Sequence, residues 1–174
     1  MTNPVLEAIS ARRSIRGYEP QQLTNEQLDT IMKAAEEAPS ARNLQPWHFS
    51  VVQNADLLAE INVETNKILK RESGDIFYAA PTVIFISCEA EARFSRIDCG
   101  IATQTIALSA HSIGLGTVIL GMPDMALNGE RSDYFKAALK IPEGSSFAIA
   151  IAVGVPTMTK EAHPIEPGRI DIIA

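Results

Sequence analysis

The hydrophobic and polar positions of this chain follow two patterns in turn. Longer segments, most with apolar residues three or four apart as on one helix face, predict helices at 4–13, 25–38, 55–70, 98–113 and 131–139. Short apolar runs bounded by turn residues predict strands at 47–53, 82–88, 117–120 and 146–155. Because helices and strands alternate, we expect an α/β or α+β domain in which helices cover a sheet.

Two segments carry apolar surface that needs a cover. The 98–113 helix has few polar positions, so it must be central in a monomer or pack against a second subunit. The apolar end of the chain, at 170–173, is typical of a segment that pairs with something else. Both features favour a homodimer.

Composition narrows the class of protein. The 174 residues fit one domain, 1–174, and are 46% hydrophobic and 21% charged, as in an ordinary soluble globular protein. A net charge of −6 argues against a dedicated nucleic-acid binder, which needs a broad basic face. The longest apolar run, 147–155, is too short to span a bilayer, and the first residues lack the pattern of a signal peptide.

The cysteines and histidines indicate no metal site. Cys88 and Cys99 are neither a close pair nor flanked by ligand-type residues, and the three histidines are scattered. We therefore expect a cytoplasmic protein with reduced thiols, without a metal and without a membrane or nucleic-acid partner.

Three arginines stand within five residues of this acidic chain, at Arg12, Arg13 and Arg16, with Ser14 among them. Guanidinium groups this close repel one another unless an anion lies between them. Arginine binds phosphate in a bidentate way, to which serine adds a short hydrogen bond. Basic residues also suit the negative end of a helix, here the 4–13 helix. The segment therefore indicates either a phosphate site or a solvated helix terminus.

A polar loop between two prolines, at 39–47, is the second candidate. It carries a hydroxyl, a guanidinium and two amides, and it ends on the only tryptophan. Amides and hydroxyls supply the donors and acceptors that the edge of a heterocycle requires, and the prolines fix the path of the loop. A loop that only satisfies its own backbone and caps the next strand is the alternative.

Glycines frame the 117–120 strand. Because the order is helix to strand, Gly114 and Gly116 do not make a dinucleotide-binding fingerprint, and the chain has no P-loop. Gly121, at the end of the strand, would let a backbone N–H approach a flat ligand closely. A simple turn glycine is an equal alternative there.

Taken in order, these segments resemble the FMN-dependent nitroreductase family over nearly the whole chain. The matching segments are 12–16, 39–47, 80–81, 98–116 and 153–156. The resemblance implies an α+β, three-layer, nitroreductase-like fold with a central mixed sheet flanked by helices. It also implies a homodimer with C-terminal strand exchange, a site shared between the subunits, and FMN as the cofactor.

The resemblance also implies a role for each matching segment. The 12–16 motif would hold the FMN phosphate and ribityl chain, with Arg16 nearest the pyrimidine side, where a cation favours negative charge on the reduced ring. The 39–47 loop of the other subunit would line the dimethylbenzene side. The backbone at 120–121 would face N5 and O4, without the glutamate side chain that often stands at position 120 in the family.

Two further residues complete the implied site. Asn66 is the best match to an asparagine that reads the pyrimidine edge, and Arg169 or Lys160 would add a late basic residue to the phosphate site. The cofactor-binding candidates are therefore Arg12, Arg13, Ser14, Arg16, Pro39, Ser40, Ala41, Asn43, Asn66, Leu120, Gly121 and Arg169.

The implied chemistry is that of an oxidoreductase without a catalytic side chain. NADH or NADPH would pass hydride to flavin N5 and leave, and a nitroaromatic, quinone or similar acceptor would then bind in the same place, in a ping-pong sequence. Recognition of a nicotinamide 2′-phosphate would need an exposed cation, for which Arg42, Lys70 and Arg71 are candidates.

Two alternatives stay open. One is an FMN-binding storage or sensor module without turnover. The other is a flavin-destroying or dehalogenating branch of the same family, whose members usually add a lid over the flavin. This chain offers only the spare loop at 124–136 for such a lid.

Overall fold

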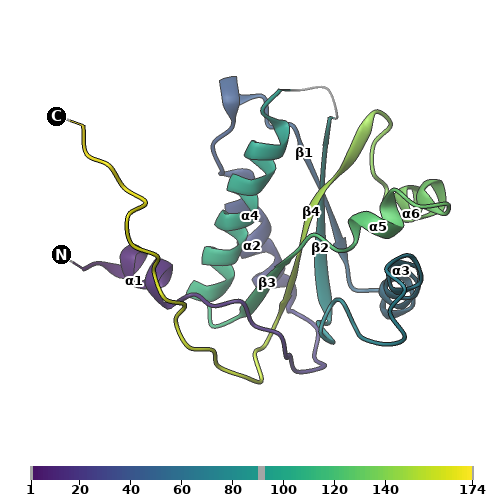
Figure 1. Cartoon of the computed structure of the whole chain (residues 1–174), viewed down its shortest axis with the longest axis horizontal. Coiled ribbons are helices and arrows are strands. Elements are labelled where there is room, and N and C mark those ends of the chain that lie inside the picture. The colour runs from purple at the N-terminus through teal and green to yellow at the C-terminus, as the bar shows by residue number, and fades with distance from the viewer. Residues whose placement is uncertain (1, 90–92, 174) are drawn as a thin grey trace.

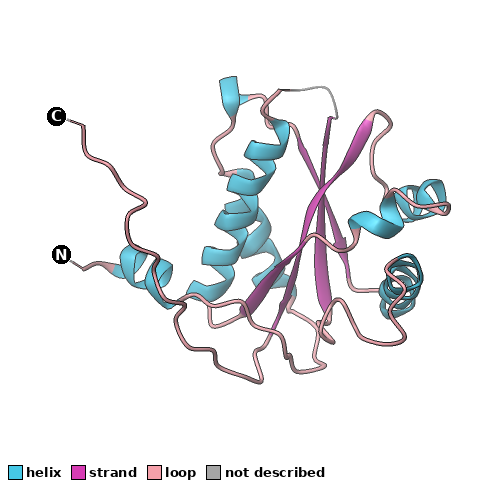
Figure 2. Ribbon diagram, in the orientation of Figure 1, coloured by secondary structure: helices cyan, strands magenta, loops and turns pink. Residues whose placement is uncertain are grey.

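The computed structural model describes residues 2–89 and 93–173 and shows a three-layer α+β fold (Figure 1). The strands are β1 (Trp47–Val52), β2 (Thr82–Glu89), β3 (Gly116–Leu120) and β4 (Ser145–Gly154). The helices are α1 (Pro4–Ala11), α2 (Asn25–Glu36), α3 (Ala55–Ile68), α4 (Ser95–Ser112), α5 (Asp124–Leu127) and α6 (Ser132–Ala138), with a short 3-10 helix at Ala41–Asn43. Helices α2 and α4 cover one face of the sheet, and α3, α5 and α6 cover the other (Figure 2).

The strand order across the sheet is β1-β2-β4-β3, and all three neighbouring pairs are antiparallel. Strands β2 and β3 point the same way, but β4 lies between them and runs in the opposite direction. The expected mixed sheet is therefore corrected to an antiparallel one. Among the described residues, the only parallel pairing is an isolated bridge between Ser14 and Thr117.

Strand β2 is buried on both of its faces. Successive side chains of a strand point to opposite faces of the sheet. Val83 and Phe85 accordingly enter the core under α3, α5 and α6, whereas Ile84 and Ile86 enter the core under α2 and α4. Because neither face meets water, the strand reads as a continuous apolar run in the sequence rather than as an alternation.

The nine elements predicted from the sequence are all present, with ends that differ by three residues at most. The expectation of a spare loop at 124–136 is wrong, because this segment holds α5 and most of α6. Ala126, Leu127 and Phe135 are buried in the core that α3, α5 and α6 cover. Helix α5, with four residues, is too short to show a helical period in the sequence, whereas α6 corresponds to the helix predicted at 131–139.

One side of the molecule exposes apolar side chains of α1 and α4. No residue of α1 is buried, and Val5 and Ile9 are 65% and 51% exposed. On α4, against which α1 packs, Ile97 is 61% exposed. None of the helices within the described ranges is long and apolar enough to cross a membrane.

After β4 the chain continues as a tail without helix or strand and leaves the body beside α1 (Figure 1). Ile170, Ile172 and Ile173 are almost fully exposed in this tail. Exchange of C-terminal strands requires a second chain, so it stays a prediction.

Candidate functional site

The arginine segment 12–16 is extended and lies beside β3. Ser14 bridges Thr117, and the Ile15 N–H donates to the Thr117 carbonyl at 2.9 Å. Ile15 is buried, and a Cβ on Gly116 would lie 3.0 Å from its side chain, so this close approach favours glycine. The last turn of α1 contains no basic residue. Arg12 is the C-terminal cap of α1, however, and Arg13 donates to the Ser10 carbonyl in its last turn, so the helix-terminus alternative stays open.

Arg13 is half-buried and keeps an unused hydrogen-bond donor. Its Nη1 donates to the carbonyls of Ser10 at 2.6 Å and Arg12 at 2.8 Å, and its Nε is buried without a partner. No carboxylate in the described part of the chain forms an ion pair with Arg12, Arg13 or Arg16. A partly desolvated guanidinium is costly unless an anion binds it. The segment therefore suits a phosphate group.

A cavity of about 280 Å³ lies beside Arg12 and Arg13. Its walls come from the ends of α1 and α4, the turn into β3 and the start of the C-terminal tail. The Thr157 N–H donates to the Gly17 carbonyl at 3.1 Å, which holds the tail beside the arginine segment. The tail then brings Lys160 to the cavity, whereas Arg169 lines a separate hollow in the tail itself. Of the two late basic residues, the structure brings Lys160 and not Arg169 to the arginines of the same chain.

Arg16 is the exposed member of the cluster. Its guanidinium carbon lies 5.6 Å from the centre of the Tyr78 ring, a cation–π contact. Tyr18 is buried and donates its hydroxyl to the Ile15 carbonyl at 2.7 Å. Burial raises the pKa of Tyr18 above its ordinary value, and the charge of Arg16 only partly opposes this rise. Tyr18 is therefore neutral, and the head of Arg16 remains open to a ligand.

Asn66 is buried on α3 with half of its amide unsatisfied. Its Nδ2 donates to Asn62 Oδ1 at 3.1 Å and to the Gly74 carbonyl at 2.7 Å. Its Oδ1 is buried and has no partner. A buried carbonyl oxygen that lacks a donor costs free energy, and an N–H on a bound heterocycle would supply that donor.

The end of β3 lies close to the end of α3. The Arg71 N–H donates to the Asn66 carbonyl at 2.9 Å, and Arg71 Nη1 lies 3.5 Å from Met122 Sδ. Leu120 is buried, and a Cβ on Gly121 would meet no atom within 4 Å, so the backbone there is open. The arginine segment lies at the start of β3 and Asn66 near its end. The arginine segment, the backbone at 120–121 and Asn66 are thus arranged along one strand.

The loop at 39–47 has a strained backbone that its own side chains hold. Arg42, Asn43 and Gln45 have φ values of 55°, 56° and 47°, in the left-handed region that non-glycine residues seldom occupy. The Gln45 N–H donates to Ser40 Oγ at 2.9 Å, and Gln45 Nε2 donates to Asn43 Oδ1 at 3.1 Å. Strained, well-held backbone of this kind clusters at ligand sites.

The loop is joined to the start of α4, and the arginine segment lies at the end of α4. The Ala41 N–H donates to both carboxylate oxygens of Asp98, at 3.2 Å each. His111, in the last turn of α4, lines the cavity with Arg13. Asp98 and His111 are about 20 Å apart along a helix that rises about 1.5 Å per residue. Figure 1 shows the loop and α1 at opposite ends of α4. The loop therefore does not reach the arginines of its own chain.

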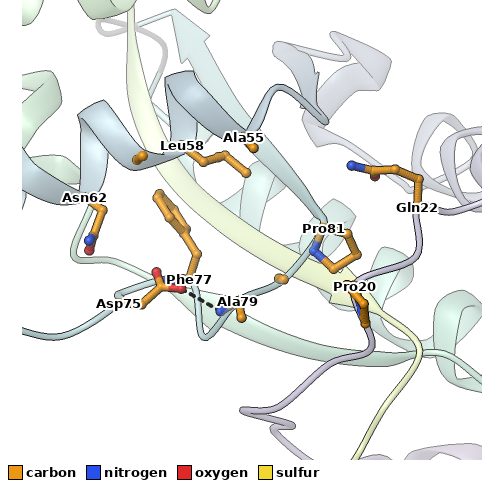
Figure 3. Close-up of a pocket in the computed structure, with 11 residues that line it drawn as sticks. Pro20, Gln22, Ala55, Leu58, Asn62, Asp75, Phe77, Ala79 and Pro81 are labelled. Atoms are coloured by element: carbon orange, nitrogen blue, oxygen red, sulfur yellow. Dashed lines mark hydrogen bonds between the residues drawn. The ribbon is translucent and has the colours of Figure 1, made fainter.

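A cavity of about 460 Å³ between α3 and the segments 20–22 and 75–81 contains none of the predicted residues (Figure 3). Its polar groups are occupied by the protein itself. Asp75 accepts hydrogen bonds from two backbone N–H groups at 2.8 Å and 2.6 Å, and Gln22 bonds to the Gln53 carbonyl and to Thr82. We therefore assign this cavity no part in the candidate site.

The residues present fit FMN by the chemistry of their unused atoms. Arg13 offers a free N–H donor beside two further cations, Arg12 and Lys160, as a phosphate requires. Asn66 offers a free acceptor, as a ring N–H requires. Sequence reasoning assigned no role to His111, Tyr78 or Asp98. Of these, only Asp98 had a recognisable signal, as an acid in the first turn of a helix.

Comparison with known proteins gives a consistent result. A sequence model of the nitroreductase family matches residues 9–155. A Methanothermobacter thermautotrophicus protein, provisionally named NADH dehydrogenase/NAD(P)H nitroreductase, is 35% identical over 173 residues, covering 97% of this chain and 86% of the relative. An FMN reductase (NADPH) of Bacillus subtilis is 26% identical over 183 residues, covering 95% of this chain and 71% of the relative. A nitroreductase with bound FMN from Desulfitobacterium hafniense matches with a TM-score of 0.91 and 32% identity over 100% of both chains.

Proposed function

Because the chain belongs to the nitroreductase family, we propose that it binds FMN and acts as an oxidoreductase that takes hydride from NADH or NADPH. The observation that carries the proposal is Arg13, a half-buried cation with an unpartnered donor beside a cavity that also contains Arg12 and Lys160. The FMN bound to the Desulfitobacterium hafniense nitroreductase supports this choice of cofactor. The bound flavin supplies the atom that accepts and then gives up hydride.

The protein contributes binding and orientation. Arg12, Arg13 and Lys160 would hold the phosphate, with Ser14 beside them, and the Asn66 carbonyl oxygen would accept a ring N–H. The exposed Arg16 would place its positive charge at the pyrimidine side of the flavin, where it would stabilise negative charge on the reduced ring. No general acid or base is needed for hydride transfer, so positioning is the main task of these side chains.

The proposal includes a homodimer that shares its site. Leu120, Gly121 and the arginines belong to one chain, and the 39–47 loop would come from the partner, because α4 separates the two groups within a chain. The exposed apolar residues of α1 and α4 support such an interface. The dimethylbenzene side of the flavin ring would then be lined by Pro39, Ser40, Ala41 and Asn43 of the partner.

Turnover fits this site better than storage. The relatives named NAD(P)H nitroreductase and FMN reductase support turnover. A nicotinamide and then a nitroaromatic, quinone or similar acceptor would bind against the flavin in a ping-pong sequence. Because α5 and α6 are packed into the core, the segment 124–136 is not free to form the lid of the flavin-destroying or dehalogenating branch. Arg71 lies beside Met122 and is therefore the best placed of the three candidate cations to meet a 2′-phosphate.

A comparison of two flavins tests the proposal. Flavin-free protein is titrated with FMN and with riboflavin, which lacks the phosphate. FMN should bind at least about tenfold more tightly, because each charge-assisted hydrogen bond is worth roughly 1.5–3 kcal/mol. Equal affinity for the two flavins would show that the arginines do not form the phosphate site, and binding of neither would refute the function.

A further inference from the structure

Asp98 is a buried carboxylate on α4 that forms a hydrogen bond with the 39–47 loop. It lies in the first turn of α4, 4% exposed, and both of its oxygens accept the Ala41 N–H at 3.2 Å. We propose that Asp98 is a positioning residue, which fixes the 39–47 loop in the shape that meets the flavin of the partner subunit. This inference rests on the proposed function, since it assigns the loop to the shared site.

The loop needs an anchor because its backbone is strained. Three of its non-glycine residues, Arg42, Asn43 and Gln45, have positive φ values, and such residues keep that conformation only where their surroundings hold it. The hydrogen bonds of Ser40 with Gln45 and with Asn43 close the loop on itself. They fix its internal shape but not its place on the molecule. The Asp98 carboxylate joins the loop to α4 and so sets where its side chains point.

A carboxylate is suited to this position. Asp98 lies in the first turn of α4, and the N-terminal end of a helix carries partial positive charge, which attracts a carboxylate. The charge strengthens the hydrogen bond from Ala41, compared with a neutral acceptor. No lysine or arginine in the described residues forms an ion pair with Asp98. The Ala41 N–H is thus a principal partner of this charge. This hydrogen bond holds the loop in the protein without flavin, so its effect on the loop can be measured before any flavin is added.

Trp47 reports on the loop without any flavin. It is the only tryptophan, it stands at the end of the loop, and it is half-buried beside Phe49. If Asp98 positions the loop, Asp98→Ala should raise the rate at which acrylamide quenches Trp47 fluorescence in flavin-free protein. Asp98→Asn should leave quenching near the wild-type rate, since the amide oxygen still accepts the Ala41 N–H.

The same variants are then measured with FMN. Asp98→Ala should weaken FMN binding at least about tenfold, whereas Asp98→Asn should weaken it less than about fivefold. The rate at which NAD(P)H reduces the flavin that remains bound should not change, but the ratio of kcat/KM values for a quinone and a nitroaromatic acceptor should shift. Thr24→Ala is the control, because it removes a helix cap on α2 and lowers Tm without touching the loop.

Two results would overturn the inference. One is an Asp98→Ala protein with wild-type quenching, flavin affinity and acceptor ratio. The other is a Thr24→Ala protein that matches Asp98→Ala in all three properties at an equal loss of Tm, since the effect would then be general destabilisation. If the wild-type protein binds no FMN, the proposed function fails, and Trp47 quenching still decides whether Asp98 holds the loop.

Discussion

At the scale of single residues, the site is marked by polar atoms that the chain leaves unused. Arg13 Nε and Asn66 Oδ1 are both buried without a partner, as are the hydroxyls of Thr65 and Ser87, which are not among the candidate residues. Such atoms cost free energy in the unliganded protein, because burial removes water and nothing replaces it. The Arg13 donor, beside other cations, fits the phosphate of FMN, and the Asn66 acceptor on α3 fits an N–H of its ring. The unused atoms therefore favour a ligand over a purely structural role.

Removal of the Arg13 side chain should weaken FMN binding. Arg13→Ala deletes a charge-assisted contact to the phosphate, so we expect a loss of about tenfold to a hundredfold in affinity. Titration of flavin-free protein measures it. Arg131→Ala is the matched control, because that arginine stands just before α6 and pairs with Glu60 of α3 in an exposed site. Wild-type affinity in Arg13→Ala would contradict the assignment.

The late basic residues should differ in their effect. Lys160 lines the cavity of the arginine segment, and Arg169 does not. Lys160→Ala should weaken FMN binding about tenfold, and Arg169→Ala should leave it within about twofold. Because both changes remove one positive charge from the same tail, each serves as the control for the other. A larger loss in Arg169→Ala would mean that Arg169 of either subunit completes the phosphate site.

Two buried side chains that can lose a proton, Tyr18 and Cys99, predict that the free energy of unfolding falls at alkaline pH. Burial raises the pKa of Tyr18 above 10.0 and the pKa of Cys99 above 9.0, and for Cys99 the neighbouring Cys88 and Asp98 act in the same direction. Below pH 9 both groups are protonated in the folded and the unfolded chain. Above pH 9 to 10, the unfolded chain loses protons that the folded chain keeps, so the free energy of unfolding falls as pH rises.

Urea unfolding at a series of alkaline pH values measures this dependence. Tyr18→Phe cannot ionise, so its free energy of unfolding should fall less steeply with pH than that of the wild-type protein. Its lost hydrogen bond to Ile15 lowers stability at every pH and does not change the slope. Equal slopes in the two proteins would show that Tyr18 ionises in the folded state as easily as in the unfolded one.

At the scale of elements, local pattern predicts what is local. The strand at 82–88 is predicted by its apolar run, and the helix at 98–113 by a long segment rich in Ala, Ile and Leu. Strand order is not predicted, because β4 pairs with β2 and β3 through contacts between residues far apart in the chain. The choice of Lys160 over Arg169 likewise depends on the pairing of the tail with Gly17, which no short motif encodes.

The apolar faces of α1 and α4 should form the dimer interface. Ile9→Asp and Ile97→Asp each place a charge on an exposed apolar position, and burial of an unpaired charge opposes association. Sedimentation should show a shift from dimer to monomer, with loss of FMN because the site is shared. Val63→Asp is the control, since Val63 is 65% exposed on α3 on the other side of the sheet. A wild-type monomer that retains FMN would contradict a shared site.

At the scale of the whole molecule, the site is divided by the length of α4. The sequence identified its segments, since arginines, amides and glycines in order are visible without coordinates. Local pattern did not place them, because the arginine segment and the 39–47 loop lie at opposite ends of one helix and, in the proposed homodimer, would meet only between subunits. In the proposed homodimer the partner would complete the site, whereas both core clusters are formed within one chain.

Reduction of the bound flavin by a nicotinamide tests the central claim most directly. The purified protein, loaded with FMN, is mixed with NADH or NADPH without oxygen, and the flavin absorbance is followed. At least one of the two should bleach the flavin, and a quinone or nitroaromatic added afterwards should restore the absorbance. A flavin that stays oxidised with both nicotinamides would contradict the account and leave a protein that stores or senses FMN.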